Sequence, residues 1–322
     1  VLNNLSNISF TPENAAICGI TEEEMKENFI PEIKKMSEAN NWSVEETHDR
    51  LKAYYDGYHF CDENMVDIYN PYSLVNALSK HRISNFWASS GATSLLPKFV
   101  DNAELRMKNF ENCRIMRNTL EMSDVSGGGA ELFLYQSGYL TIKDSDEFGY
   151  ILGFPNEEVK QALYEMVLPA LTMRERSDIQ SIQANLYAQL GTGRIDDAMK
   201  SLKALIADVP YSNKKLASMD MEERYRLIIS TILNAIGLSV EVEKMISTGR
   251  IDMTVKTSRY IYVIELKLRN NGGKEAATEQ ILNRQYMEPF KADKRKVIGL
   301  GIELDEEGKG LLDWKRTESF SE

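Results

Sequence analysis

The run YIYVIELKL at residues 260–268 constrains the fold most strongly, because it places two charged residues inside an otherwise apolar strand. Its β-branched and aromatic residues are typical of a central strand. Glu265 and Lys267 are two positions apart, so both side chains point to the same face of that strand. Burying a charge is costly unless a partner or a metal ion compensates it. The run therefore predicts a site at which charged groups converge.

Asp252 begins the preceding predicted strand, and a short turn joins that strand to residues 260–268. A hairpin of this kind brings Asp252 beside Glu265. The two carboxylates and the carbonyl oxygen of Leu266 are hard ligands that can hold Mg²⁺ or Mn²⁺ and leave water positions open. Such a cation favours phosphodiester hydrolysis, because it acidifies a bound water and stabilises charge on the phosphate. Lys267 would orient that water or help to deprotonate it.

Two repeated motifs show that sequence context carries this prediction. Asp/Glu-x-Lys occurs six times, but only ELK at 265–267 stands in a β-branched and aromatic run, and the other five are interpreted as surface charge. GRID occurs twice, at 193–196 and at 249–252. The first copy leads into a predicted helix, where Asp196 is an ordinary first-turn acid. The second copy leads into a predicted strand ahead of Glu265.

Several neighbouring residues have two interpretations each. Glu241 and Glu243 share one face of the first predicted strand, where one of them could reach the metal or both could be paired at a solvent-facing edge. Glu223 is either a site acid or a residue that complements the helix dipole. Gln280, on the helix after the ELK strand, could contact a phosphate or a water. Arg250 is either a phosphate contact or a salt-bridge partner.

The first part of the chain is predicted to be mainly helical. Capping boxes begin helices at Thr21 and Ser43, and Asn70 followed by proline begins another. Strand-like runs at 138–143 and 150–155, joined by a polar turn, predict a β-hairpin. Because this hairpin follows several helices, it resembles the wing of a winged-helix module.

The last part of the chain has a different pattern, in which predicted strands alternate with predicted helices. From residue 221 to residue 304 the pattern predicts the order α-β-β-β-α-β, with helices at 222–237 and 274–290 and a closing strand at 295–304. This order indicates a mixed sheet with helices packed on it. Together with the helical first part, it makes the fold class α+β.

Composition excludes several classes of protein. No run of about 18 apolar residues occurs, so a membrane span is excluded, and the first residues lack the features of a signal peptide. The three cysteines lie far apart without a CxxC motif, which argues against a disulfide scaffold and favours a reducing cytoplasm. The three histidines form no zinc-binding motif and are interpreted as structural.

Charge is unevenly distributed along the chain. The 322 residues carry a formal net charge of −11, which argues against a protein that simply coats nucleic acid. Residues 244–316, however, hold 15 Lys and Arg against 11 Asp and Glu, a net charge of +4. Residues 1–243 carry −13. The region with the predicted site is therefore compatible with a nucleic-acid partner.

GRID, IELKL and the helix that contains Ala276 and Gln280 resemble the PD-(D/E)XK nuclease superfamily. More closely, nearly the whole chain resembles bacterial proteins that join an AAA-ATPase-like domain to a C-terminal PD-(D/E)XK domain. YYDGYHF, YNPYSLVNAL, YQSGYLTIK and LGFPNEEVK are similar to the middle region of those proteins. The site implied by this resemblance consists of the metal-binding acids Asp252 and Glu265, the catalytic lysine Lys267, the strand acid Glu243, the helix acid Glu223 and the helix glutamine Gln280.

The resemblance also implies a division of the chain. Residues 1–100 would resemble the lid of an AAA ATPase, 101–155 a winged-helix-like segment, 156–220 a helical connector and 221–322 the nuclease domain. Proteins of this kind normally begin with an ATPase core, but this sequence contains no GxxxxGK[ST] motif. It therefore resembles a fragment or a variant that lacks the nucleotide site, and ATP binding by this chain is not expected.

The expected function is Mg²⁺- or Mn²⁺-dependent cleavage of nucleic acid, DNA above all, in the cytoplasm. The alternative is a non-catalytic nucleic-acid-binding or regulatory module that retains the nuclease fold. A homo-oligomer is compatible with the sequence.

Overall fold

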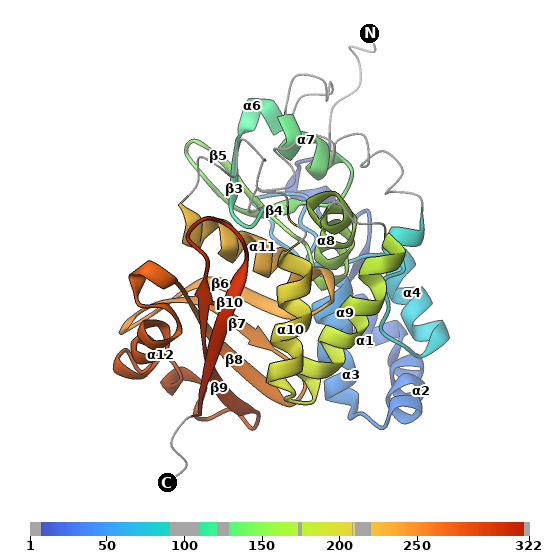
Figure 1. The fold of residues 1–322 in the computed structure, drawn as a ribbon. Helices are drawn as coiled ribbons and strands as arrows, with labels where there is room; N and C mark the ends of the chain where they lie inside the picture. The colour runs from blue at the N-terminus through green and yellow to red at the C-terminus, as the bar shows by residue number, and fades with distance from the viewer. Residues whose placement is uncertain are drawn as a thin grey trace. The chain divides into compact units, whose positions relative to one another are not determined.

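The computed structural model describes residues 8–90, 110–120, 129–172, 176–207, 209 and 220–318. The chain forms two compact units, Val1–Leu163 and Tyr164–Glu322 (Figure 1). The glycine-rich sequence SDVSGGGA at 123–130, expected to be a surface loop, and the polar sequence VPYSNKKLASMD at 209–220, expected to be a linker, lie mostly outside the described residues. No helix in the described part of the chain is long and apolar enough to cross a membrane.

The first unit begins with short helices whose starting points agree with the predicted caps. Thr21 and Glu24 form a complete capping box, Ser43 accepts a hydrogen bond from the Glu46 N–H, and Asn70 accepts one from Ser73. The elements of this part are η1 (Pro12–Asn14), β1 (Ile20–Thr21), α1 (Glu22–Asn28), α2 (Ile30–Asn40), α3 (Val44–Tyr55), β2 (Ile68–Tyr69), α4 (Pro71–Lys80) and η2 (Trp87–Ser90). Buried side chains from all four α-helices share one hydrophobic cluster.

A three-stranded antiparallel sheet of order β3-β5-β4 follows in the first unit. The predicted hairpin is present as β4 (Thr141–Asp146) and β5 (Gly149–Gly153), whereas β3 (Cys113–Met116) was not predicted. The accompanying helices are α6 (Arg117–Leu120), α7 (Gly129–Gln136) and α8 (Glu157–Thr172), the last of which runs past the unit boundary.

The second unit is built on a five-stranded sheet of order β10-β9-β8-β7-β6, in which only the β8–β9 pair is parallel. Its elements are α9 (Arg176–Gly191), α10 (Ile195–Ile206), α11 (Met221–Ala235), β6 (Ser239–Ile246), β7 (Gly249–Lys256), β8 (Tyr260–Leu268), η6 (Arg269–Asn271), α12 (Gly273–Asn283), η7 (Glu288–Phe290), β9 (Lys296–Leu304) and β10 (Leu311–Glu318). The predicted α-β-β-β-α-β order is therefore present. The edge strand β10 was not predicted.

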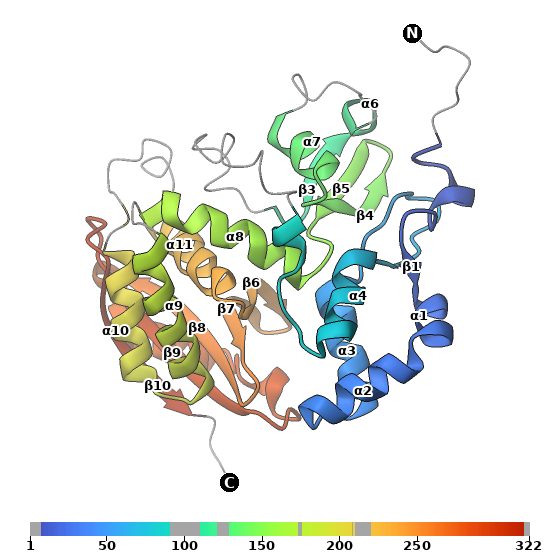
Figure 2. The same ribbon diagram turned by 90° about the vertical axis from the view of Figure 1, so that its right-hand side faces the viewer.

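Helices cover both faces of this sheet (Figures 1 and 2). α12 packs on β8 and β9, and α11 packs on β6, β7 and β8. The helix pair α9–α10 also belongs to this unit, because the Tyr262 hydroxyl donates to the Leu190 carbonyl at 2.6 Å and the Trp314 indole donates to Asp196 at 2.8 Å. β8 is buried along almost its whole length, as expected for a central strand.

Candidate functional site

The sheet of the second unit opens at one point between β7 and β8. Main-chain pairing of these strands ends at Met253 and Ile264. Beyond that point two side chains replace the ladder: the Asp252 N–H donates to Glu265 Oε2 at 3.5 Å, and the Leu266 N–H donates to Asp252 Oδ2 at 2.9 Å. Two carboxylates are thereby held side by side, each anchored to the other strand.

These two carboxylates lie in a poor environment for negative charge. Glu265 is 2% exposed and Asp252 is 8% exposed. Burial, and then the charge of Asp252, raise the pKa of Glu265, while Lys267 acts in the opposite direction. Two like charges thus share one buried position, and the basic side chains nearby offset them only in part. This imbalance is typical of functional sites.

Helix α11 places two further charged residues at the site. Glu222 and Arg226 are four positions apart and so share one face of the helix. Glu222 Oε1 accepts the Leu268 N–H at 3.1 Å, and its Oε2 lies 3.7 Å from Lys267 Nζ. The sequence pointed to Glu223 as the helix acid, but that residue is exposed and it is Glu222 that contacts the lysine.

Arg226 is the residue that sequence analysis missed. Its Nη1 donates to Asp252 Oδ1 at 3.1 Å, and its Nη2 lies 3.1 Å from Glu243 Oε1. The side chain is 13% exposed. Their spacing on an amphipathic helix indicates that Glu222 and Arg226 share one face. The sequence does not show, however, where on the sheet that helix packs.

Glu243 stands opposite Asp252, between two regular pairs of β6 and β7. Its φ of 54° lies in the left-handed region, which costs a non-glycine residue about 1 kcal/mol. In this conformation its carboxylate contacts both Arg226 and Arg250, the latter at 3.0 Å. Arg250 is thus a salt-bridge partner. Glu241, the other acid considered on this strand, pairs instead with lysines on β6 and β7.

Gln280 reaches the acidic pair from α12. Its Nε2 donates to Glu265 Oε1 at 2.5 Å and to the Tyr286 hydroxyl at 3.4 Å. The side chain therefore orients a carboxylate, which differs from the phosphate or water contact considered from the sequence.

The donor set suits a hard divalent cation. Asp252 and Glu265 offer carboxylate oxygens, and the carbonyl group of Leu266 lies between Glu265 and Lys267 on the same strand. Oxygen donors of this kind are those that Mg²⁺ and Mn²⁺ prefer. Within the described residues, no group of three or more His, Cys, Asp or Glu side chains gathers around one point. A cation here would therefore be bound by two carboxylates, and its positive charge would offset the repulsion between them.

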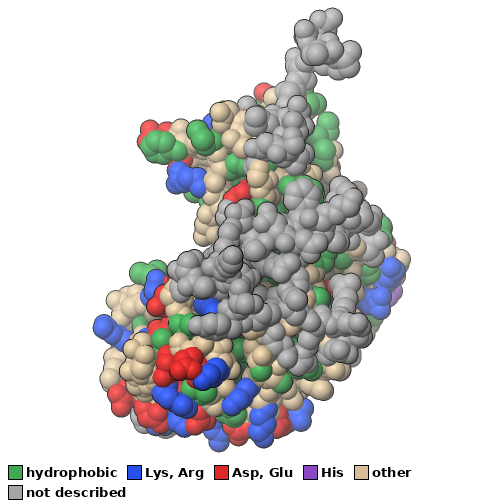
Figure 3. Space-filling view, turned by 45° about the horizontal axis from the view of Figure 1, so that its top comes forward, with side chains coloured by type: hydrophobic (Ala, Val, Ile, Leu, Met, Phe, Trp, Pro, Cys, Tyr) green, Lys and Arg blue, Asp and Glu red, His purple; other side chains and the backbone are tan. Residues whose placement is uncertain are grey.

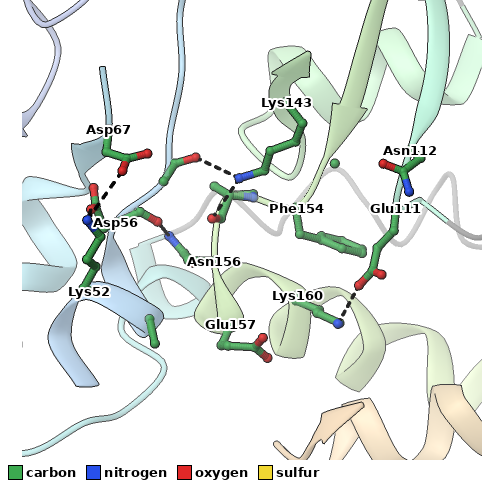
Figure 4. Close-up of a pocket in the computed structure, with 14 residues that line it drawn as sticks. Lys52, Asp56, Asp67, Glu111, Asn112, Lys143, Phe154, Asn156, Glu157 and Lys160 are labelled. Atoms are coloured by element: carbon green, nitrogen blue, oxygen red, sulfur yellow. Dashed lines mark hydrogen bonds and ion pairs between the residues drawn. The ribbon is translucent and has the colours of Figure 1, made fainter. Parts of the chain in front are cut away.

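A cavity of about 450 Å³ in the first unit is a second candidate (Figure 4). Its wall contains several charged side chains, of which the lysines are engaged with acids or with the main chain, whereas burial raises the pKa of Asp56 and of Glu157. The lysines make these contacts: Lys160 Nζ to Glu111 Oε1 at 2.6 Å, Lys52 Nζ to Asp67 Oδ2 at 3.6 Å, and Lys143 Nζ to the Gly57 and Pro155 carbonyls at 3.2 and 3.3 Å. The lysines of this cavity therefore already have partners.

Surface charge does not mark a nucleic-acid interface on the face shown in Figure 3. Among the residues drawn in colour there, acidic and basic side chains are intermingled, with no broad surface of one sign. The functional argument therefore rests on the acidic pair and the residues around it.

The geometry agrees with the comparison to known families. Residues 220–314 match the PD-(D/E)XK nuclease superfamily. A domain of that superfamily thus spans α11 to β10 and includes Asp252, Glu265 and Lys267. The PD-(D/E)XK part of the sequence resemblance is confirmed.

One curated protein also matches nearly the whole chain. It is an uncharacterized protein in the vnfD 5′ region of Azotobacter chroococcum mcd 1, and it is 27% identical over 325 residues. The match covers 97% of this chain and 58% of that protein, so the chain spans a little over half the length of its relative. No solved structure matches the chain.

Proposed function

We propose that the PD-(D/E)XK domain hydrolyses phosphodiester bonds in nucleic acid, with DNA as the expected substrate and Mg²⁺ or Mn²⁺ as the cofactor. The observation that carries this proposal is the buried pair of Asp252 and Glu265 at the point where β7 and β8 separate. A lysine two residues beyond Glu265 completes the set of groups that the reaction needs.

The residues around the pair have separable roles. Asp252, Glu265 and the Leu266 carbonyl would hold a divalent cation, which would supply positive charge to acidify a water and to offset charge on the phosphate. Lys267 orients that water or accepts its proton. Glu222 positions the lysine through the 3.7 Å contact between Glu222 Oε2 and Lys267 Nζ.

Gln280 and Glu243 complete the proposal. Gln280 orients Glu265 by donating to its Oε1. Glu243, which the sequence resemblance made a further metal-site acid, is engaged by two arginines, and we assign it a supporting role. Glu223 has no role in this proposal, because Glu222 makes the contact with Lys267.

A non-catalytic nucleic-acid-binding or regulatory module is the second candidate. The observation in its favour is Arg226, whose guanidinium already donates to Asp252 Oδ1. If this contact were permanent, the acidic pair would be a structural salt-bridge network rather than a metal site.

The regions before the nuclease domain carry predictions of their own. The family match begins at residue 220, so the AAA-ATPase-like and winged-helix-like resemblances of earlier residues remain predictions. The same holds for the cytoplasmic location and for a homo-oligomer.

A cleavage assay tests the proposed function. The intact protein is incubated with supercoiled DNA, single-stranded DNA and RNA in the presence of Mg²⁺, Mn²⁺ or EDTA. Asp252→Asn is compared with Asp196→Asn, because both aspartates end a GRID motif and only Asp252 belongs to the acidic pair.

We expect metal-dependent cleavage by the wild type and by Asp196→Asn, and loss of cleavage in Asp252→Asn. Circular dichroism and thermal unfolding establish that all three proteins are folded. Nuclease activity is rejected if the folded wild type cleaves none of the substrates, or if Asp252→Asn cleaves them as fast as the wild type.

A further inference from the structure

Arg226 supplies positive charge to one carboxylate of the acidic pair. It donates to Asp252 Oδ1, while the other oxygen of that carboxylate accepts the Leu266 N–H. Each Asp252 oxygen therefore already has a protein partner. A carboxylate oxygen has lone pairs for a second partner, but a guanidinium and a divalent cation on one partly buried carboxylate repel each other.

We propose that Arg226 is a displaceable counter-cation, which pairs with Asp252 in the metal-free domain and releases that carboxylate when a divalent cation binds. The inference rests on the proposed function, since it concerns the same metal site. Metal binding must then break the Arg226–Asp252 contact, and the free energy of that contact lowers the affinity for the metal.

The second contact of Arg226 gives it a place to remain. Nη2 lies 3.1 Å from Glu243 Oε1, and Glu243 is held on its other side by Arg250. The carboxylate of Glu243 is 42% exposed, and the left-handed backbone of this residue sets its direction. When Asp252 is released, the guanidinium can keep its contact with Glu243 and need not enter an apolar environment. The displacement is therefore a small movement of one side chain.

Two assignments of Arg226 predict opposite effects on metal affinity. If the guanidinium competes with the cation, its removal strengthens metal binding. If it orients Asp252 as a ligand, its removal weakens metal binding, as is usual for residues that hold a metal ligand in place. Calorimetric titration of Mn²⁺ into the intact protein distinguishes the two.

We compare the wild type with Arg226→Met, Arg226→Lys and Arg295→Met. Arg226→Met is expected to bind Mn²⁺ about tenfold more tightly, because one charged hydrogen bond no longer has to be given up. Arg226→Lys keeps the charge but loses the two-pronged geometry, so we expect an intermediate gain. Arg295→Met is the matched control, since Arg295 also pairs with an aspartate, Asp293, but contacts none of the residues of the acidic site, and its affinity should stay at the wild-type value.

Thermal unfolding provides a second measurement. In EDTA, Arg226→Met should unfold at a lower temperature than the wild type, because the acidic pair loses a counter-charge, and Mn²⁺ should raise its unfolding temperature by more. If Arg226→Met does not fold, Arg226→Lys carries the test. Equal or weaker Mn²⁺ binding by the folded Arg226 variants overturns the proposal.

This outcome is separable from the nuclease assay. Tighter Mn²⁺ binding by Arg226→Met together with no cleavage of any substrate would support the displacement of Arg226 and reject nuclease activity. Cleavage by the wild type together with weaker Mn²⁺ binding by Arg226→Met would keep the nuclease and make Arg226 a positioning residue.

Discussion

The two candidate sites differ in how their buried charges are arranged, although both contain several. In the cavity of the first unit, Lys160 pairs with Glu111, and Lys143 donates to main-chain carbonyls. In the second unit, Asp252 and Glu265 face each other across the opening between β7 and β8. Like charges held side by side repel, so the acidic pair needs counter-charge, of which Arg226 supplies a part. The close approach of two buried carboxylates therefore distinguishes the second site from the first.

The largest effect should come from the lysine of the acidic site. Lys267→Ala is expected to lower the cleavage rate by about 10²- to 10⁴-fold, the range of a lost general acid or base. Lys309→Ala is the matched control, because Lys309 ends another Asp/Glu-x-Lys motif, in which it pairs with Glu307. Initial rates on supercoiled DNA give both values. Equal rates for the two variants would remove Lys267 from the mechanism.

Asp56 of the first unit tests whether a buried acid outside the acidic pair affects stability without affecting metal binding. Burial raises the pKa of Asp56 to about 6, from an ordinary value of 3.8. The folded protein thus holds this proton more tightly than the unfolded chain does, so the carboxyl reduces stability progressively as the pH rises from about 4 to about 6. Asp56→Asn should remove this loss and gain about 3 kcal/mol in free energy of unfolding above pH 6.

Urea titrations between pH 4 and pH 8 measure this difference. Asp67→Asn is the control, because Asp67 lies in the same cavity wall but pairs with His59 and Lys52. We expect no effect of Asp56→Asn on Mn²⁺ affinity. A stability difference between wild type and Asp56→Asn that does not change with pH would show that burial of Asp56 carries no proton linkage.

Glu222 and Glu223 provide a smaller effect within the second unit. Glu222→Gln should lower the cleavage rate about tenfold, because Lys267 loses the carboxylate that holds it. Glu223→Gln should cleave at the wild-type rate, since its side chain is exposed. Rates measured across a range of substrate concentrations show whether the loss lies in kcat, as expected for a positioning residue. A larger loss in Glu223→Gln would restore the assignment made from the sequence.

The smallest effect concerns Glu243. In the wild-type background, Glu243→Gln should weaken Mn²⁺ binding roughly threefold, because Arg226 then has only Asp252 to hold. In the Arg226→Met background the same change should have no effect. A loss of affinity in both backgrounds would instead make Glu243 a direct metal ligand. Calorimetric titration of Mn²⁺ into the wild type, the two single variants and the double variant completes this double-mutant cycle.

The parts of the fold that the sequence predicted are those that depend on local rules. The caps at Thr21, Ser43 and Asn70 depend on one side chain and the next few N–H groups. The hairpin of β4 and β5 and the buried strand β8 depend on alternation and side-chain type. The edge strand β10 was not predicted, because its mixed polarity conceals the alternation; it contains DWK at 313–315, one of the five motifs interpreted as surface charge.

The site was predictable only where strand geometry determines contacts. Glu265 and Lys267 share a face because they are two residues apart, and the hairpin brings Asp252 to Glu265. The contacts of Arg226 and Glu222 depend on how α11 is rotated over the sheet, which tertiary packing decides. The left-handed conformation of Glu243 could not be predicted, because glutamate has no preference for it.

The most direct test of the central claim is calorimetric titration of Mn²⁺ into the intact wild-type protein, Asp252→Asn, Glu265→Gln and Asp196→Asn. If the acidic pair is a metal site, the wild type and Asp196→Asn bind Mn²⁺, whereas Asp252→Asn and Glu265→Gln lose that binding while remaining folded. Absence of binding in the folded wild type, or equal binding by all four proteins, would contradict a metal site at Asp252 and Glu265.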